Sequence, residues 1–497
     1  MSVATRERTG TPSAPLPVVT AAVTAGGVAG ALLVGLQPGL NWLLTAGAVA
    51  AAVAVAWRRQ VSRHLLVFSG LSLALVATAV HTSAQWQLVV NLACAVGLAS
   101  LAVAPGRTWT EVLLGLTAIG WRAPGALAWL VRVHHRRPVR ESAPGAFALM
   151  RGLLLGSVLL VVFGALFVSA DEAFAQLAGR ALEVPDISYG LLPARLVLAG
   201  SVAVFAAALA SFAPALNVGD GGPISWTARV GAELGERNRR RLGRTEWVTA
   251  LIMLDALFVV FVAVQVAVLF GGREHVLETS GLTYAQYARS GFFQLLVVAA
   301  LTLLVLASLA RYARREGMHD TLVLELLGGI LVVLTMVVLA SALKRLSLYE
   351  EVYGFTRLRL AVHATILWMV GLFVIVATAA LATNARWMPR VVVVFSALAV
   401  LVFTLLRPDA LIASRNVARF ELTGKIDTSY LRALSPDAVP VLATLPEPER
   451  TCALVDLRAG LTEPESLWSF NLARDAAREV FSNTPESANA LQTCPYR

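Results

Sequence analysis

Long apolar runs separated by short polar connections dominate the sequence. A run of about twenty residues can cross the roughly 30 Å hydrocarbon core of a bilayer as a helix. The pattern predicts about eleven such helices, near residues 17–36, 41–57, 65–81, 87–104, 146–169, 193–213, 247–270, 291–310, 321–342, 360–382 and 389–406. We therefore expect an all-α fold, a polytopic membrane helix bundle with the transmembrane domain over 17–406.

One further segment, "EVLLGLTAIGWRAPGALAWLVRV" (111–133), is also long and apolar. Arg122, Pro124 and Gly125 interrupt its middle, and arginines flank both ends. If this segment crossed the membrane, every later helix would change direction. Two short interfacial or re-entrant helices on the cytoplasmic face fit the pattern better.

Arginine clusters occupy alternate connections and set the expected orientation. The segment "ERNRRRLGR" (236–244) and the stretch from Arg132 to Arg140 are strongly basic, whereas "HTSAQWQ" (81–87) on the opposite side is neutral. Basic connections stay in the cytoplasm. The tail over 1–16 is therefore predicted to be cytoplasmic, and an odd number of helices places residues 407–497 outside.

The composition supports a membrane protein, and no nucleic acid is expected as a partner. Hydrophobic residues make up 57% of the chain and charged residues 14%, which is typical of integral membrane proteins. The net charge of +10 gathers between apolar runs, as membrane orientation requires. Arginine far outnumbers lysine and, with the abundant Ala and Val, suggests a GC-rich bacterial genome. The expected location is the bacterial cytoplasmic membrane, with the bilayer as partner.

The last segment, 407–497, is mixed polar and predicts a small helical extracytoplasmic appendage. Within it, "FELTGKIDTSYL" (420–431) contains Thr-Gly-Lys but lacks the other residues of a phosphate-binding loop. Gly424 instead fits the end of one helix, and Asp427 fits the cap of the next. Candidates for docking this corner to the outer loops are Asn416, Lys425, Asp427 and Tyr430.

The cysteines agree with the outside placement of the tail. Cys94 lies in a predicted span, while Cys452 and Cys494 both lie in the tail. An oxidising compartment would allow the two tail cysteines to pair. The alternative is two unpaired thiols.

Polar residues inside the spans form the first candidate site. A charge in hydrocarbon costs about 2.5–3.5 kcal/mol on insertion scales and usually has a partner or a function. Four side chains could line a polar cavity for a cation or a proton: Asp255, Gln265, Gln294 and Glu325. Alternatively, each pairs with a neighbouring helix or reaches the inner interface.

Tyrosines beside carboxylates and arginines in the outer connections form the second candidate site. Rigid rings supply contact area and charges supply orientation for a ligand. Its members are Asp171, Asp186, Tyr189, Arg195, Tyr284, Tyr287, Arg289, Tyr349, Glu350, Tyr353 and Arg357. The alternative is that they only solvate the loops and lock them together. The sequence carries no recognisable motif for a metal or another cofactor.

Several long stretches resemble a known family. They are "RTEWVTALIMLDALFVVFVAVQVAVLFGG" (244–272), "GLTYAQYARSGFFQLL" (281–296), "SALKRLSLYEEVYGFTRLRLAVHA" (341–364) and "RPDALIASRNVARFELTGKIDTSYLRALSPDAVPVL" (407–442). They are similar to the bacterial membrane-protein family catalogued as domain of unknown function 4173, with its sibling 4153. The resemblance covers roughly 165–445. It implies a multi-helix membrane protein without an assigned activity and supplies no catalytic residues.

Three functions remain open from the sequence. The first is a non-catalytic envelope protein whose outer loops and tail bind a ligand or partner, or signal. The second is a transporter of a small solute or ion through a path near Asp255. The third is a membrane enzyme that uses Asp171 or Asp186 on a lipid-linked substrate. The arrangement of the buried carboxylates distinguishes the three functions. The carboxylates would be paired with other residues in the envelope protein, line a cavity in the transporter, or converge at an outer groove in the enzyme.

Overall fold

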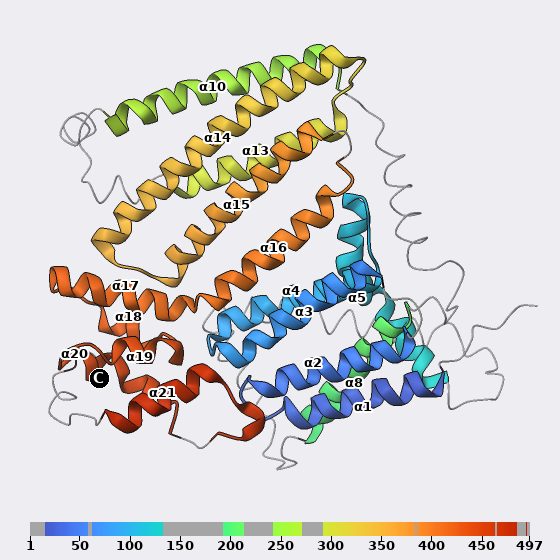
Figure 1. Ribbon diagram of the computed structural model, residues 1–497, viewed down its shortest axis with the longest axis vertical. Coiled ribbons are helices and arrows are strands. Elements are labelled where there is room, and N and C mark those ends of the chain that lie inside the picture. Colours follow the sequence, from blue (N-terminus) through green and yellow to red (C-terminus); the bar gives the residue numbers. More distant parts are fainter. Residues whose placement is uncertain are drawn as a thin grey trace, which may run out of the picture. The chain divides into compact units, whose positions relative to one another are not determined.

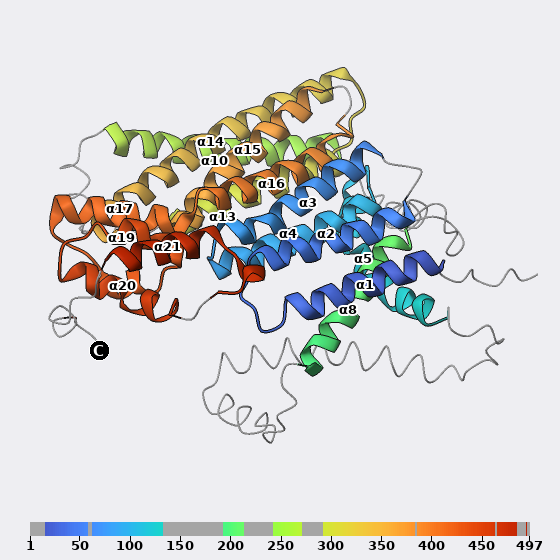
Figure 2. The same cartoon turned by 60° about the horizontal axis from the view of Figure 1, so that its bottom comes forward.

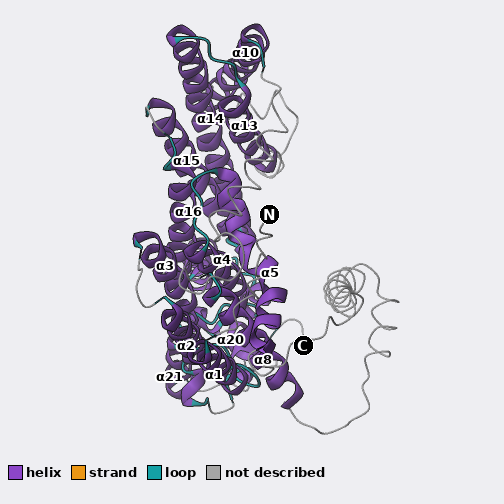
Figure 3. Cartoon of the chain, turned by 90° about the vertical axis from the view of Figure 1, so that its right-hand side faces the viewer, coloured by secondary structure: helices purple, strands orange, loops and turns teal. Residues whose placement is uncertain are grey.

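The computed structural model describes residues 15–57, 62–132, 192–212, 242–270, 292–382, 385–462, 465–484 and 494. These residues form helices and turns without a strand (Figure 3), apart from one isolated bridge between Leu242 and Ala313. The longer helices of the first half are α1 (Leu16–Leu32), α2 (Leu40–Ala56), α3 (Arg63–His81), α4 (Gln85–Val103), α5 (Trp109–Arg132), α8 (Leu192–Ala210) and α10 (Arg244–Phe270). They are followed by α13 (Phe292–Tyr312), α14 (Met318–Tyr353), α15 (Arg357–Leu381) and α16 (Met388–Leu405). The all-α class is confirmed.

The predicted apolar runs that fall on described residues coincide with helices, and the run 146–169 lies outside those residues. Among the described helices, 7 are long and apolar enough to cross a membrane. These are α3, α4, α10, α13, α14, α15 and α16, while α1, α2 and α8 are apolar but shorter. Large apolar side chains such as Val260, Leu304 and Val333 face outward, as lipid contact favours. The chain is thus a multi-pass membrane protein, and the total of about eleven spans stays a prediction.

The segment 111–133 differs from the expectation of two short helices. It forms one continuous helix, α5, that runs through Arg122, Pro124 and Gly125. A proline inside a helix removes one backbone hydrogen bond, yet α5 continues on both sides of Pro124. The helix α5 is not among the candidate spans of the described chain.

The chain forms two compact units. The smaller unit holds α1, most of α2, the second part of α5, and α8. Its α1 packs directly against α8, as Figure 2 shows. A Cβ atom added at Gly26 would lie 2.3 Å from the Ala199 carbonyl oxygen, and one at Gly30 would lie 2.6 Å from that of Arg195. The two glycines therefore allow close contact between helices of the same chain.

Replacing Gly26 with leucine is expected to force α1 and α8 apart. Overpacking of this kind costs about 1–3 kcal/mol, because the clash is with backbone that cannot move aside. Gly27→Leu is the matched control, since nothing lies within 4 Å of a Cβ at Gly27. The check is the apparent melting temperature in detergent, and equal values for both variants would contradict this packing.

The larger unit contains the remaining helices of the bundle, which Figure 1 shows running side by side. In it, α14 packs against α10, α13 and α15. The core of this contact includes the fully buried side chains of Trp247, Leu331 and Phe373. A buried polar link joins three other helices: Asn91 of α4 donates to Thr78 of α3 at 2.7 Å and accepts from Thr404 of α16 at 3.2 Å.

The helix α14 extends well beyond the predicted span 321–342. It contains 36 residues and is therefore about 54 Å long at 1.5 Å per residue, so its last turns extend past the hydrocarbon core. The predicted connection 343–359 is thus mostly helical. Gly354, at φ 77°, ends the helix, and an added Cβ there would lie 2.5 Å from Asn416 Oδ1.

The tail folds into a helical domain, defined here as residues 408–484. It comprises α17 (Pro408–Thr423), α18 (Thr428–Arg432), η2 (Pro436–Ala438), α19 (Val439–Leu442), α20 (Glu449–Ala459), η3 (Leu467–Ser469) and α21 (Leu472–Asn483). Ile412, Leu431 and Leu442 are buried in its apolar core. Gly424 ends α17 in the left-handed region at φ 67°, and the Asp427 carboxylate accepts from the Tyr430 backbone N–H at 3.0 Å. The predicted corner between two helices is confirmed.

Candidate functional site

Four segments of the larger unit meet in a set of buried and half-buried charged and hydroxyl side chains, which we name the polar junction. They are the α3–α4 connection, the start of α15, the α16–α17 connection with the first turn of α17, and the start of η2. The members of the junction are Thr82, Ser83, Arg357, Arg407, Asp409, Ser435 and Asp437.

Local sequence explains how the two carboxylates reach this position. Arg407 adopts the left-handed region at φ 48°, which is uncommon for a residue other than glycine. Pro408 then starts α17, because its fixed φ suits the first helical position, and Asp409 lies in the first turn. Similarly, Ser435 and Pro436 start η2 ahead of Asp437. Each carboxylate thus lies near the amino end of a helical segment, where backbone N–H groups favour negative charge.

Asp409 is fully buried and receives four hydrogen bonds. Arg357 donates from Nε at 2.9 Å and from Nη2 at 2.6 Å, which makes a bidentate ion pair. The Ser435 backbone N–H donates at 2.8 Å and the Trp86 indole at 3.4 Å. Each oxygen of the buried Asp409 carboxylate therefore accepts hydrogen bonds, and Arg357 balances its negative charge.

Asp437 is also buried, and donors surround its Oδ2. The Thr82 hydroxyl donates at 3.1 Å, the Ser83 N–H and hydroxyl each at 3.0 Å, and the Ser435 hydroxyl at 2.9 Å. Its Oδ1 lies 4.0 Å from Arg407 Nε. Ser435 thus bonds to both carboxylates and joins them into one network, which ties the helical domain to the ends of α3 and α15.

The predicted outer site is only partly assembled in the described chain. The rings of Tyr349 and Tyr353 lie 4.8 Å apart, and the Arg359 guanidinium lies 4.3 Å from the centre of the Tyr349 ring. Glu350 is instead buried, with Oε1 3.2 Å from His363 Nδ1. Arg357 belongs to the polar junction, and Arg195 is an exposed residue of α8 in the smaller unit. The other predicted members lie outside the described residues: Asp171, Asp186, Tyr189, Tyr284, Tyr287 and Arg289.

Two of the four predicted docking residues contact the end of the bundle. Asn416 donates to the Phe355 carbonyl at 2.9 Å and accepts from its N–H at 3.0 Å. The Tyr430 hydroxyl accepts from the Arg357 N–H at 2.7 Å. Burial raises the pKa of the Tyr430 phenol above its ordinary value, so the ring stays neutral. Asp427 caps its own helix, and Lys425 contributes its carbonyl oxygen to Arg419.

The predicted intramembrane set does not share one environment. Asp255 is buried, with neither carboxylate oxygen hydrogen-bonded within the described chain. Gln294 and Glu325 are exposed, and the side chain of Gln265 lies outside what the structure describes. The described members therefore form no common polar cavity.

Most members of the polar junction escaped the sequence-based prediction, which included only Arg357. A signal was present: "RPDA" (407–410) and "SPDA" (435–438) repeat the order proline, aspartate, alanine. An acidic residue directly after a helix-starting proline is placed close to backbone donors. No comparable sequence pattern identifies their partners Thr82 and Ser83.

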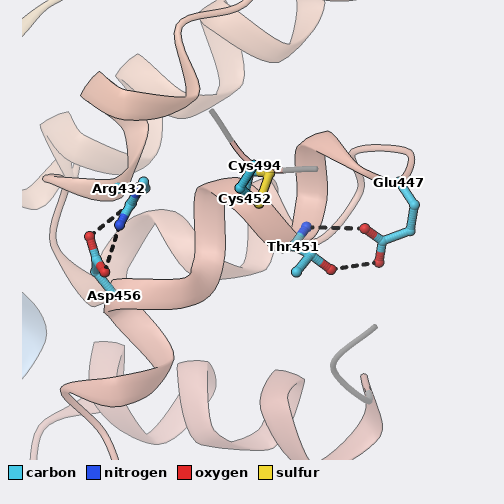
Figure 4. Close-up of a disulfide and its surroundings, with 6 residues drawn as sticks. All are labelled: Arg432, Glu447, Thr451, Cys452, Asp456 and Cys494. Atoms are coloured by element: carbon cyan, nitrogen blue, oxygen red, sulfur yellow. Dashed lines mark hydrogen bonds and ion pairs between the residues drawn. A yellow bond between two sulfur atoms is a disulfide. The ribbon is translucent and has the colours of Figure 1, made fainter. Parts of the chain in front are cut away.

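A disulfide joins α20 of the helical domain to residue 494. Cys452 and Cys494, separated by 42 residues, are bonded with Cα atoms 5.4 Å apart (Figure 4). Nearby, Thr451 donates to Glu447 from its N–H at 3.2 Å and from its hydroxyl at 3.0 Å. Burial alone would raise the pKa of Glu447, but these bonds and Arg450 outweigh it and lower the pKa. Within the described chain, no three His, Cys, Asp or Glu residues gather as a metal site.

The residues of the polar junction fall within a region of the chain that matches a known family model. No curated protein and no solved structure matches the chain. The family model for the domain of unknown function DUF4153 matches residues 69–445, which include every member of the polar junction. The match begins well before residue 165, where the expected resemblance starts, and it is to the family named there as the sibling. The chain belongs to the family of domain of unknown function 4153.

Proposed function

We propose that the protein is a non-catalytic protein of the bacterial cytoplasmic membrane. In this proposal the helical bundle holds the helical domain outside the cytoplasm, where the domain binds a ligand or partner, or signals. The observation that carries this is the polar junction, in which Asp409 and Asp437 are engaged as structural acceptors. Buried carboxylates of this kind fix one part of a molecule to another.

The outside placement of the helical domain rests on two independent arguments. The arginine-rich connections alternate with neutral ones, as expected if they stay in the cytoplasm. The bond between Cys452 and Cys494 would persist in an oxidising compartment. Alkaline phosphatase fused after Arg497 is expected to be active, and an inactive fusion beside an active one after Arg140 would reverse the assignment.

An enzymatic role finds less support than a binding role. A general acid or base needs a proton position that a substrate can reach, whereas Asp409 is fully buried with both oxygens occupied. The lipid-linked reaction considered from the sequence relies on Asp171 and Asp186, which lie outside the described residues. The two acids that this reaction would use therefore give it no structural support.

One observation favours transport as the second candidate. Asp255 lies within the candidate span Arg244–Ala263, is buried, and has no hydrogen bond to a described residue. Ionisable groups inside membranes often mark a proton or cation path. Glu325 and Gln294, which would continue such a path, are exposed instead.

A reconstitution experiment separates the two candidates. Proteoliposomes holding the full chain, a trapped pH dye and an imposed K⁺ gradient are compared with those holding Asp255→Asn. We expect equal proton and K⁺ leak for both, because a binding protein needs no titrating group in its spans. Flux through the native chain that Asp255→Asn removes would establish transport and overturn the proposal. Thr302→Val, another buried polar change within a span, is the control for nonspecific leakage.

A further inference from the structure

A short segment of the helical domain exposes apolar side chains. We define the apolar turn as Leu467, Trp468, Phe470 and Leu472, which lie in η3, directly after it, and at the start of α21. Their exposed fractions are 86%, 52%, 38% and 45%, respectively. Four large apolar side chains exposed within six consecutive residues are unusual for a surface in water.

The apolar turn is fixed to the ends of membrane helices. Buried Asn471 donates to the Ala79 carbonyl at 2.7 Å and the Thr82 carbonyl at 2.9 Å, at the end of the candidate span α3. The Leu40 N–H, at the start of α2, donates to the Phe470 carbonyl at 3.0 Å. An added Cβ at Gly39 would lie 2.2 Å from the Ser469 carbonyl oxygen. The turn is therefore held in close contact with the start of α2 and the end of α3.

The arginines near the turn are directed back into the protein. Arg474 is buried and donates to Glu465 and to the Pro38 carbonyl, the latter at 2.9 Å. Arg478 also pairs with Glu465. These charged groups are thus engaged in contacts within the protein, and the apolar side chains of the turn remain exposed.

The backbone of the turn is suited to a medium poor in water. The Ser469 N–H donates to the Ser466 carbonyl at 2.9 Å, and the Phe470 N–H donates to that of Leu467 at 3.3 Å. The Trp468 N–H is 3.4 Å from the Ser466 hydroxyl. With these groups already hydrogen-bonded, entering a lipid interface leaves few of them unsatisfied.

We infer that the apolar turn inserts into the membrane interface and anchors the helical domain to the lipid surface. Tryptophan favours the headgroup level, and the turn lies beside the start of α2 and the end of α3. The helix α4, which begins three residues after Thr82, also exposes the apolar side chains of Val89 and Val90 in its first turns. The occupant is thus the same bilayer that surrounds the spans. This inference is independent of the proposed function and of which side the domain occupies.

Site-directed spin labelling of the full chain in lipid nanodiscs tests the anchor. Leu467→Cys in a Cys94→Ser background places a nitroxide at the most exposed position of the turn. Its collision rates with oxygen, which concentrates in lipid, and with a water-soluble nickel complex are measured. The control is Ala459→Cys on α20, an exposed position of an element that packs on α18 and α19. The Cys94→Ser chain without an added cysteine must remain unlabelled.

We expect nickel collisions at position 467 to be several-fold lower than at 459, with oxygen collisions higher. Nickel access as high as at position 459 would show a turn exposed to water and overturn the inference. Low access to both reagents would show that protein, such as a second copy, covers the turn, and would overturn it as well. Leu467 is 86% exposed, so its replacement removes little packing.

Discussion

Replacing Arg357 with alanine is expected to destabilise the attachment of the helical domain by about 3 kcal/mol, near the lower end for breaking a buried ion pair. The value is near the lower end because the Arg357 side chain is 35% exposed, whereas that of Asp409 is completely buried. The substitution leaves the Asp409 carboxylate without its charged partner. The measurement is pulse proteolysis of the purified protein across a urea series, following cleavage within 408–445.

Arg432→Ala is the matched control for that experiment. Arg432 also pairs with a carboxylate through two hydrogen bonds, of 2.8 and 3.0 Å to Asp456. Asp456 is 57% exposed, and exposed ion pairs contribute only about 0–1 kcal/mol. If the two variants unfold at the same urea concentration, Arg357 does not hold the domain in place.

Removing the disulfide by Cys452→Ser is expected to lower the free energy of unfolding of the helical domain by about 4 kcal/mol. The bond closes a loop of 42 residues, and the chain-entropy model attributes the loss to a freer unfolded chain. The same urea series measures this loss, and reduction of the native protein should reproduce it.

Cys94→Ser separates loss of the disulfide from loss of any thiol, because Cys94 is a free cysteine of α4. This variant should unfold like the native protein. Mass spectrometry without reduction should find Cys452 and Cys494 protected from alkylation. Alkylation of both in the native protein would disprove the pairing.

The positions of the membrane helices that the structure describes could be predicted from sequence because the bilayer imposes one simple requirement. A span needs about twenty apolar residues whatever its neighbours are. The ends of the helices could be predicted less accurately from this requirement. Residues 344–353 continue α14 because nothing in "KRLSLYEEVY" breaks a helix before Gly354, and Pro124 did not divide α5.

The polar junction could not be predicted in the same way. Asp437 and its partner Thr82 are separated by 355 positions in the chain, and short polar residues such as Thr82 and Ser83 resemble any other loop. Their role depends on which helix ends meet, and hydrophobic pattern carries no such information. Arg357 was identified only because a charged residue beside tyrosines is noticeable in its own segment.

The polar junction also determines whether the tail can fold without the helical bundle. Composition changes sharply at residue 407, which suggests a tail that could be removed or produced alone. Yet Asp409 and Asp437 draw their compensating donors from α15 and from the α3–α4 connection. Residues 408–484 produced without the bundle would retain two acidic side chains stripped of those partners. The point where hydrophobicity ends is therefore not a boundary between autonomously folding parts.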